Sequence, residues 1–156
     1  MQWSRARVRG AGFRRQARRG GAEEGSAVVE FIFLAVLLMI PVVYLILTVG
    51  QVQGGAYAVV GAADQAAKVF VLSDNPAAAH QAAEQAVALA VTDLGFDAAN
   101  ARLTISCDGG CLTAGSTVHA RVELSVELPG VGAVPGIDAT AATVDASAHQ
   151  KVGRFK

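Results

Sequence analysis

The sequence predicts an α+β fold in which one long apolar helix precedes a small domain with a helix and a sheet. Three patterns predict this fold: an uninterrupted apolar run near the N-terminus, an alanine-rich segment with helical spacing, and C-terminal segments in which apolar and polar residues alternate. The composition is 53% apolar, which excludes a disordered chain. We therefore divide the chain into a basic leader (1–25), an apolar helix with its extension (26–72) and an α+β head (73–156).

The formal net charge of zero conceals a strong asymmetry along the chain. Residues 1–25 contain seven arginines and two glutamates, a net charge of +5, which leaves a net charge of −5 for residues 26–156. The first segment has no apolar period, so we expect an extended, disordered basic tail. Few aromatic residues lie among its arginines, and no nucleic-acid partner is expected.

The apolar run extends over the 23 residues from Ala27 to Val49, and Glu30 is its only charged residue. At about 1.5 Å per residue, a helix of this length spans roughly 35 Å and crosses a bilayer. The arginines precede the run, so the positive-inside rule places the N-terminus in the cytoplasm and the chain after about Gly50 on the far side of the cytoplasmic membrane. Pro41 removes one backbone hydrogen bond, and we expect a helix kink there.

A second helix is predicted after the extension of the first. The segment from Gly50 to Lys68 is rich in small residues and continues the first helix, weakened by glycines that each cost about 1 kcal/mol relative to alanine. A polar cap at Ser73–Asn75 precedes Pro76, which predicts a new helix start, and Gly95 predicts its end. Its expected apolar face consists of Ala79, Ala83, Ala86, Val87, Ala90 and Leu94.

Beyond Asn100 the apolar period changes from 3.6 to 2, which predicts a meander of about three antiparallel strands. Residues 102–107, 118–128 and 142–149 each alternate between apolar and polar side chains, and the third strand is expected to begin before residue 142. Ile137 and Ala139 are out of phase with the rest of the third strand, so we expect a bulge near Ala141. Pro129–Gly136 is the expected connecting loop, and the alanine-rich helix is expected to pack on the apolar face of the sheet.

The start of the apolar run carries the functional signal. Glu30 lies in an apolar environment, which is costly unless the carboxylate is paired or near an interface. One interpretation is that Glu30 lies in the first helical turn, where the helix dipole favours an anion. Another is that cutting after Gly25 creates an amino group at Ser26, with a pKa near 8, that pairs with Glu30 of an adjacent subunit and sets the register of stacked helices.

These residues resemble the class III signal of type IV pilin-like proteins. In that signal a basic leader ends in glycine, a glutamate follows at the fifth mature position, an aromatic residue comes next, and a long apolar helix follows. Gly25, Ser26, Glu30 and Phe31 match it here. The whole layout resembles the TadE-like minor pseudopilins of tight-adherence (Tad) pilus and secretion systems.

The resemblance implies a structural subunit in the cytoplasmic membrane, with its head outside the cytoplasm. It implies that a prepilin peptidase cuts between Gly25 and Ser26, and that Glu30 and Phe31 serve assembly. The implied partners are the peptidase, other Tad pilins and pseudopilins, inner-membrane platform proteins and membrane lipid. Two alternatives stay open: an anchored exported binding or adhesion module, and a secreted protein with an ordinary signal peptide cut near Ala58.

Enzyme activity is not expected, because the polar residues of the head form no nucleophile turn, acid–base pair or phosphate loop. No cofactor is expected either.

Cys107 and Cys111 are expected to form a disulfide in an exported domain, and the chain-entropy model gives a stabilisation of roughly 2 kcal/mol for this disulfide. A redox role would favour a CxxC spacing. Zinc would need two more ligands, whereas His119 and His149 are expected to face outward, so no metal site is expected.

Overall fold

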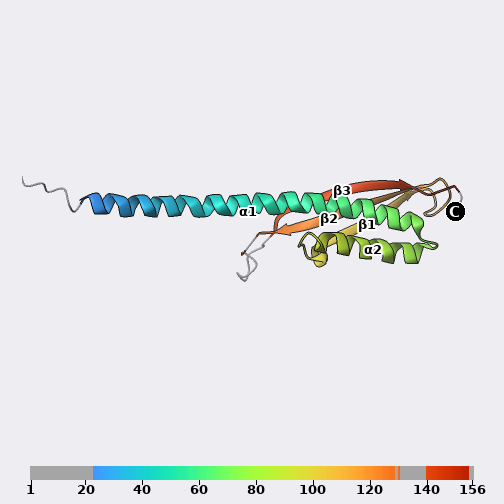
Figure 1. Ribbon diagram of the computed structural model, residues 1–156. Helices are drawn as coiled ribbons and strands as arrows, with labels where there is room; N and C mark the ends of the chain where they lie inside the picture. The colour runs from blue at the N-terminus through green and yellow to red at the C-terminus, as the bar shows by residue number, and fades with distance from the viewer. Residues whose placement is uncertain (1–22, 129, 131–139, 155–156) are drawn as a thin grey trace, which may run out of the picture. The chain divides into compact units, whose positions relative to one another are not determined.

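The computed structural model describes residues 23–128, 130 and 140–154, with side chains described from Ser26 onward except that of Ala141. It confirms the predicted α+β fold: a long N-terminal apolar helix, a second helix and a three-stranded antiparallel sheet (Figure 1). The elements are α1 (Glu23–Leu72), α2 (Pro76–Thr92), the 3₁₀ helix η1 (Ala98–Asn100), β1 (Ala101–Asp108), β2 (Thr117–Glu127) and β3 (Thr140–Lys151). The chain separates into two compact units, Met1–Pro41 and Val42–Lys156.

Helix α1 begins at Glu23, three residues before the predicted start of the helix. Residues 1–22 of the predicted basic tail lie outside the described residues. The helix includes Pro41 without interruption and continues through the glycine-rich segment to Leu72, as expected for the extension. The kink at Pro41 stays a prediction.

Helix α2 begins and ends where the sequence predicts. The side chain of Asn75 accepts a hydrogen bond from the Ala78 N–H at 2.9 Å, and Pro76 occupies the first helical position. At the other end, Gly95 has φ +83°, its N–H donates to the Thr92 carbonyl, and the Phe96 N–H donates to the Val91 carbonyl. This pair of bonds is a Schellman motif, which uses glycine at the left-handed position.

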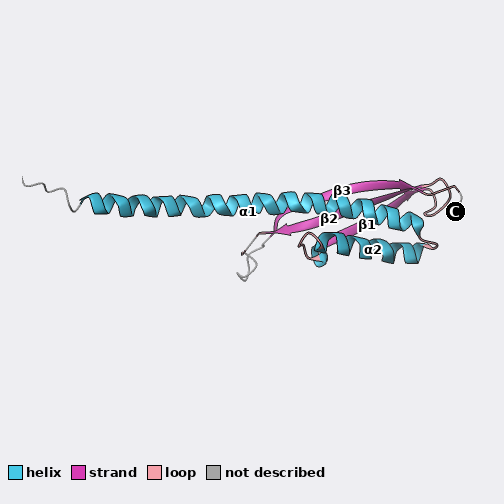
Figure 2. Cartoon of the chain, in the orientation of Figure 1, coloured by secondary structure: helices cyan, strands magenta, loops and turns pink. Residues whose placement is uncertain are grey.

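The three strands form one sheet in the order β1-β2-β3, with β2 in the centre (Figure 2). The predicted bulge is confirmed, because Val126 pairs with Ala142 whereas Glu127 pairs with Thr140, which leaves Ala141 as the additional residue. Ile137, Ala139 and the predicted loop, apart from Gly130, lie outside the described residues.

The core lies between one face of the sheet and the two helices. The inward side chains of β2 are fully buried, and they are Val118, Ala120, Val122, Leu124 and Val126. Helix α2 contributes Ala79, Ala83, Val87 and Val91. The larger helical contribution comes from the C-terminal part of α1, with Ala58, Val59, Ala62, Ala63, Ala66, Ala67 and Phe70.

Two details of the packing differ from the sequence prediction. Leu94, expected on the apolar face of the second helix, lies beyond its last residue and is 55% exposed. Val91 is buried in its place, one turn after Val87. The sheet is also not covered by α2 alone, because the alanine-rich part of α1 packs on it as well. Small alanine side chains on both helices let the helices approach the sheet closely.

Candidate functional site

The predicted processing site lies at the N-terminal end of α1. The bond between Gly25 and Ser26 is in the first turn of the helix, where N–H groups have no partner within the helix. Helix ends open more easily than helix interiors, so this is the part of α1 that unwinds at least cost. The predicted cut therefore lies before the apolar segment of the helix, which begins at Ala27.

Glu30 and Phe31 lie on the exposed surface of α1. Phe31 is 71% exposed, and Glu30 forms no hydrogen bond or ion pair with any residue that the structure describes. Ser26 precedes Glu30 by four residues, which places the two on the same face of the helix, one turn apart. The structure therefore brings together the predicted new N-terminus and the predicted assembly carboxylate.

The helix surface around Glu30 is apolar and uncovered. All large apolar side chains from Val28 to Val49 are at least 39% exposed. Within Ser26–Leu72, the most apolar window of 18 residues has a mean hydropathy of 2.9, and none of that window is buried. Among the described residues this is the one helix long and apolar enough to cross a membrane.

The two cysteines form the expected disulfide. Cys107 lies near the end of β1, Cys111 lies in the turn that follows, and their Cα atoms are 5.5 Å apart. The chain after the turn is also attached to the end of β3, since the Val152 N–H donates to the Ser116 carbonyl at 2.9 Å and the Gly115 N–H donates to the Val152 carbonyl at 3.1 Å. The disulfide therefore closes a turn that is held at both ends.

The outer face of the sheet carries a charge cluster that was not singled out from the sequence. Arg121 on β2 contacts Glu123 on its own strand and Asp145 on β3, each at 3.2 Å. His119 lies 2.9 Å from Asp108 on β1, and its ring centroid is 6.1 Å from that of His149. A signal for this cluster was present, because these charges alternate with the apolar residues and so share one face.

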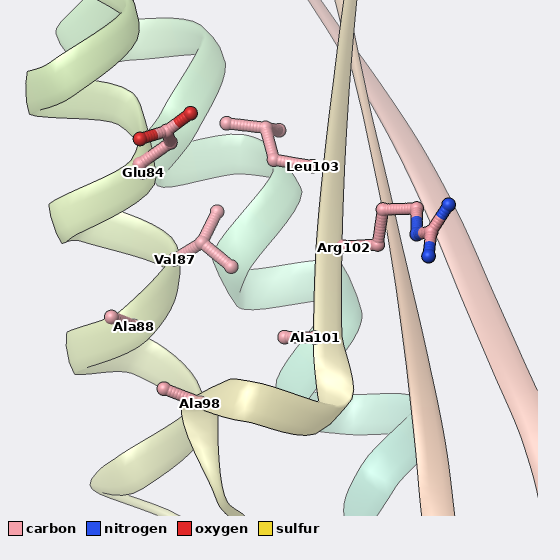
Figure 3. A pocket seen from close by; sticks show the side chains of 7 residues that line it. All are labelled: Glu84, Val87, Ala88, Ala98, Ala101, Arg102 and Leu103. Atoms are coloured by element: carbon pink, nitrogen blue, oxygen red, sulfur yellow. The ribbon is translucent and has the colours of Figure 1, made fainter.

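One hollow of the head, between α2 and β1, does not bring its charged side chains together. This hollow of about 330 Å³ has Val87, Ala88, Ala98, Ala101 and Leu103 among its lining residues. Figure 3 shows that its two charged lining residues do not converge, because Arg102 points away from α2 on the opposite side of β1 from Leu103. No group of three or more metal-ligating side chains in the described part of the chain is arranged to hold a metal ion.

The architecture is therefore pilin-like, with an N-terminal apolar helix followed by a small antiparallel sheet. It places Gly25, Ser26, Glu30 and Phe31 together at the beginning of the helix and the disulfide in the head. The chain matches no protein-family model, no curated protein and no solved structure.

Proposed function

We propose that this protein is a structural pilin-like subunit, a minor pseudopilin of a Tad-type pilus or secretion system. The observation that carries the proposal is Glu30, a single carboxylate on an exposed apolar helix surface, without a partner among the described residues and five positions after Gly25. A carboxylate in such a place is costly unless it is paired with a cation or lies near an interface.

Processing supplies that cation. A prepilin peptidase on the cytoplasmic side hydrolyses the bond between Gly25 and Ser26, and residues 1–25 leave with the new carboxylate. The new amino group at Ser26 is largely protonated at neutral pH. In an apolar surrounding it pairs with Glu30 of a neighbouring subunit, and removing either partner leaves a buried charge uncompensated. The pair therefore fixes how far one helix is shifted along the next.

The exposed apolar surface of α1 suits both the membrane-bound precursor and the assembled subunit. Before assembly, residues 28–49 lie in membrane lipid, because their large side chains have no cover within the described chain. After processing, the same surface packs against other pilins and pseudopilins and against the platform proteins of the inner membrane. The head, on the far side of the cytoplasmic membrane, is where a disulfide persists.

The alternative of an ordinary signal peptide cut near Ala58 is less well supported. Ala58 lies inside α1 and is only 1% exposed, because it packs in the core of the head. A cut there would divide a helix whose next turns, including Val59 and Ala62, belong to the same core. The burial of Ala58 therefore argues against a cut near Ala58.

The test is the N-terminus of the protein from native membranes, determined by mass spectrometry. A chain that begins at Ser26 supports the proposal, and one that begins at Met1, or at Tyr57 or beyond, contradicts it. Gly25→Val should leave a precursor heavier by the leader, since the peptidase tolerates little side chain there.

Assembly is tested separately at Glu30. Glu30→Gln keeps the size of the side chain but removes its charge, so it should be processed normally yet fail to enter the filament or its base. Glu30→Asp keeps the charge and serves as the matched control, with partial assembly expected. If Glu30→Gln assembles as well as the parent protein, the pairing role of Glu30 is wrong.

A further inference from the structure

Strand β3 has an unpaired edge in the part of the chain that the structure describes. It pairs with β2 on one side, and none of the described strands pairs with its other side (Figure 1). The strand is 12 residues long, and its segment 142–151 contains neither proline nor glycine. Such a long regular edge offers a row of N–H and C=O groups to another strand.

The main-chain direction identifies which residues present those groups. The Val152 N–H donates to the Ser116 carbonyl, on the β2 side of the strand. Successive residues of a strand direct their N–H and C=O groups to opposite sides, so even-numbered residues from 142 onward bond toward β2. The odd-numbered residues, including Asp145, Ser147, His149 and Lys151, direct theirs to the free edge.

The charges on these residues are self-complementary. Asp145 lies near the middle of the strand, Lys151 is its last residue, and both side chains face outward from the core. When two copies of β3 run antiparallel with Ala148 opposite the partner's Ala148, Asp145 lies opposite the partner's Lys151. The two-fold axis repeats this pair, so one register makes two opposite-charge contacts.

Both charged side chains are able to make this contact. Asp145 is 47% exposed, and its contact with Arg121 uses only one of its two carboxylate oxygens. Lys151 forms no ion pair with a residue that the structure describes. In the same register, Ser147 lies opposite the partner's His149, and no like charges face each other.

The inward side of β3 gives a second reason for a partner. Val144, Ala146 and Ala148 are half-buried, whereas the inward residues of β2 are fully buried. A second copy of the strand extends the apolar face beyond the edge and covers part of these side chains. Only alanine meets alanine at the two-fold axis, so the strands approach without steric conflict.

We propose that β3 is the contact surface between two copies of this protein, which join their heads into one six-stranded sheet by antiparallel β3–β3 pairing. The other edge of the sheet is less suited. The terminal Asp108 of β1 is already engaged by His119 at 2.9 Å. The pairing uses the head alone, and so it does not depend on cutting at Gly25 or on Glu30.

The test is position-specific disulfide cross-linking of the full-length protein in membranes. Directly opposed residues in an antiparallel pair have Cα atoms about 4.5–5.5 Å apart, within the range of a disulfide. Co-expressed Ser147→Cys and His149→Cys chains, carrying different tags, should form a cross-linked heterodimer. Thr104→Cys, on the outer face of β1, is the matched control and should form no dimer.

Charge-reversal variants distinguish cross-links formed in this register from cross-links formed by random collision of the heads. Lys151→Glu places like charges opposite each other twice and should reduce cross-linking roughly tenfold. Adding Asp145→Lys exchanges the two charges and should restore it. Arg154→Glu makes the same charge change beyond the end of β3 and should have no effect.

Three results would overturn the proposal: no cross-link between positions 147 and 149 above the Thr104→Cys level, no loss with Lys151→Glu, or no recovery in the charge-exchanged protein. Repeating the experiment in the Glu30→Gln background keeps the two proposals distinguishable. Cross-linking that persists while assembly is lost supports pairing of the heads. It shows that this pairing does not require Glu30, whose role is tested by assembly.

Discussion

Gly55 of α1 lies directly against Val126 of β2. A Cβ atom added to Gly55 would stand 2.7 Å from the Cγ2 atom of Val126 and 3.3 Å from the Cγ2 atom of Val144 on β3. Real Cβ atoms essentially never make a contact as short as 2.7 Å, so the backbone of α1 approaches Val126 as closely as it does because residue 55 has no side chain. The glycine-rich part of the helix is therefore a packing surface for the head.

We predict that Gly55→Ala destabilises the head by up to about 2 kcal/mol. Overpacking a core position costs about 1–3 kcal/mol, and the better helix propensity of alanine returns up to about 1 kcal/mol. Chemical denaturation of the full-length protein in detergent, followed by circular dichroism, measures the change.

Gly61→Ala is the matched control in the same helix. A Cβ at Gly61 meets nothing within 4 Å, so this substitution should stabilise the protein by up to about 1 kcal/mol. If the two substitutions shift the unfolding midpoint in the same direction, the close approach at Gly55 does not limit the packing.

Sequence periodicity was sufficient to predict the strands and helices, because the pattern that identifies each element lies within that element's own residues. Asn75 and Gly95 predicted the two ends of α2, and the phase change before Ala142 predicted the bulge at Ala141. The processing and assembly residues, from Gly25 to Phe31, could be proposed for the same reason, since they lie close together in the sequence.

The packing of α1 on the sheet could not be predicted in the same way. Alanine and glycine contribute little to an amphipathic pattern, so the stripe from Ala58 to Phe70 resembled a weak helical extension rather than a core surface. The contact of Arg121 with Asp145 depends on the strand register, which joins residues far apart in the sequence. Such contacts follow from tertiary structure and not from local spacing.

Removing the disulfide should weaken the head without unfolding it. Replacing both Cys107 and Cys111 by serine removes a constraint on a short loop, for which the chain-entropy model gives about 2 kcal/mol. The turn keeps its main-chain bonds to Val152, so the sheet should still form. Denaturant unfolding of the double variant should match that of the reduced parent protein, and a larger loss in the variant than in the reduced protein would point to a packing role of the sulfur atoms.

The start of α2 should depend on one side chain. Asn75→Ala removes the acceptor that bonds to the Ala78 N–H at 2.9 Å, and losing such a cap costs about 1 kcal/mol. Asp74→Ala changes the neighbouring polar residue, which is not the cap, and should cost much less. Hydrogen exchange of the first turn of α2 provides the local readout, with faster exchange expected for Asn75→Ala alone.

The ion pairs of Arg121 should contribute little to stability and should respond to salt. Both carboxylate partners are about half exposed, with 42% of Glu123 and 47% of Asp145 accessible, so water screens the attraction. Arg121→Gln should therefore cost less than about 1 kcal/mol at low salt, and the difference from the parent protein should shrink as ionic strength rises, because exposed charges are screened within about 10 Å at 0.1 M salt. Unfolding midpoints of both proteins at low and high salt measure this difference. A loss that stays the same at high salt would mean that Arg121 acts through packing of its long side chain on the sheet rather than through its charge.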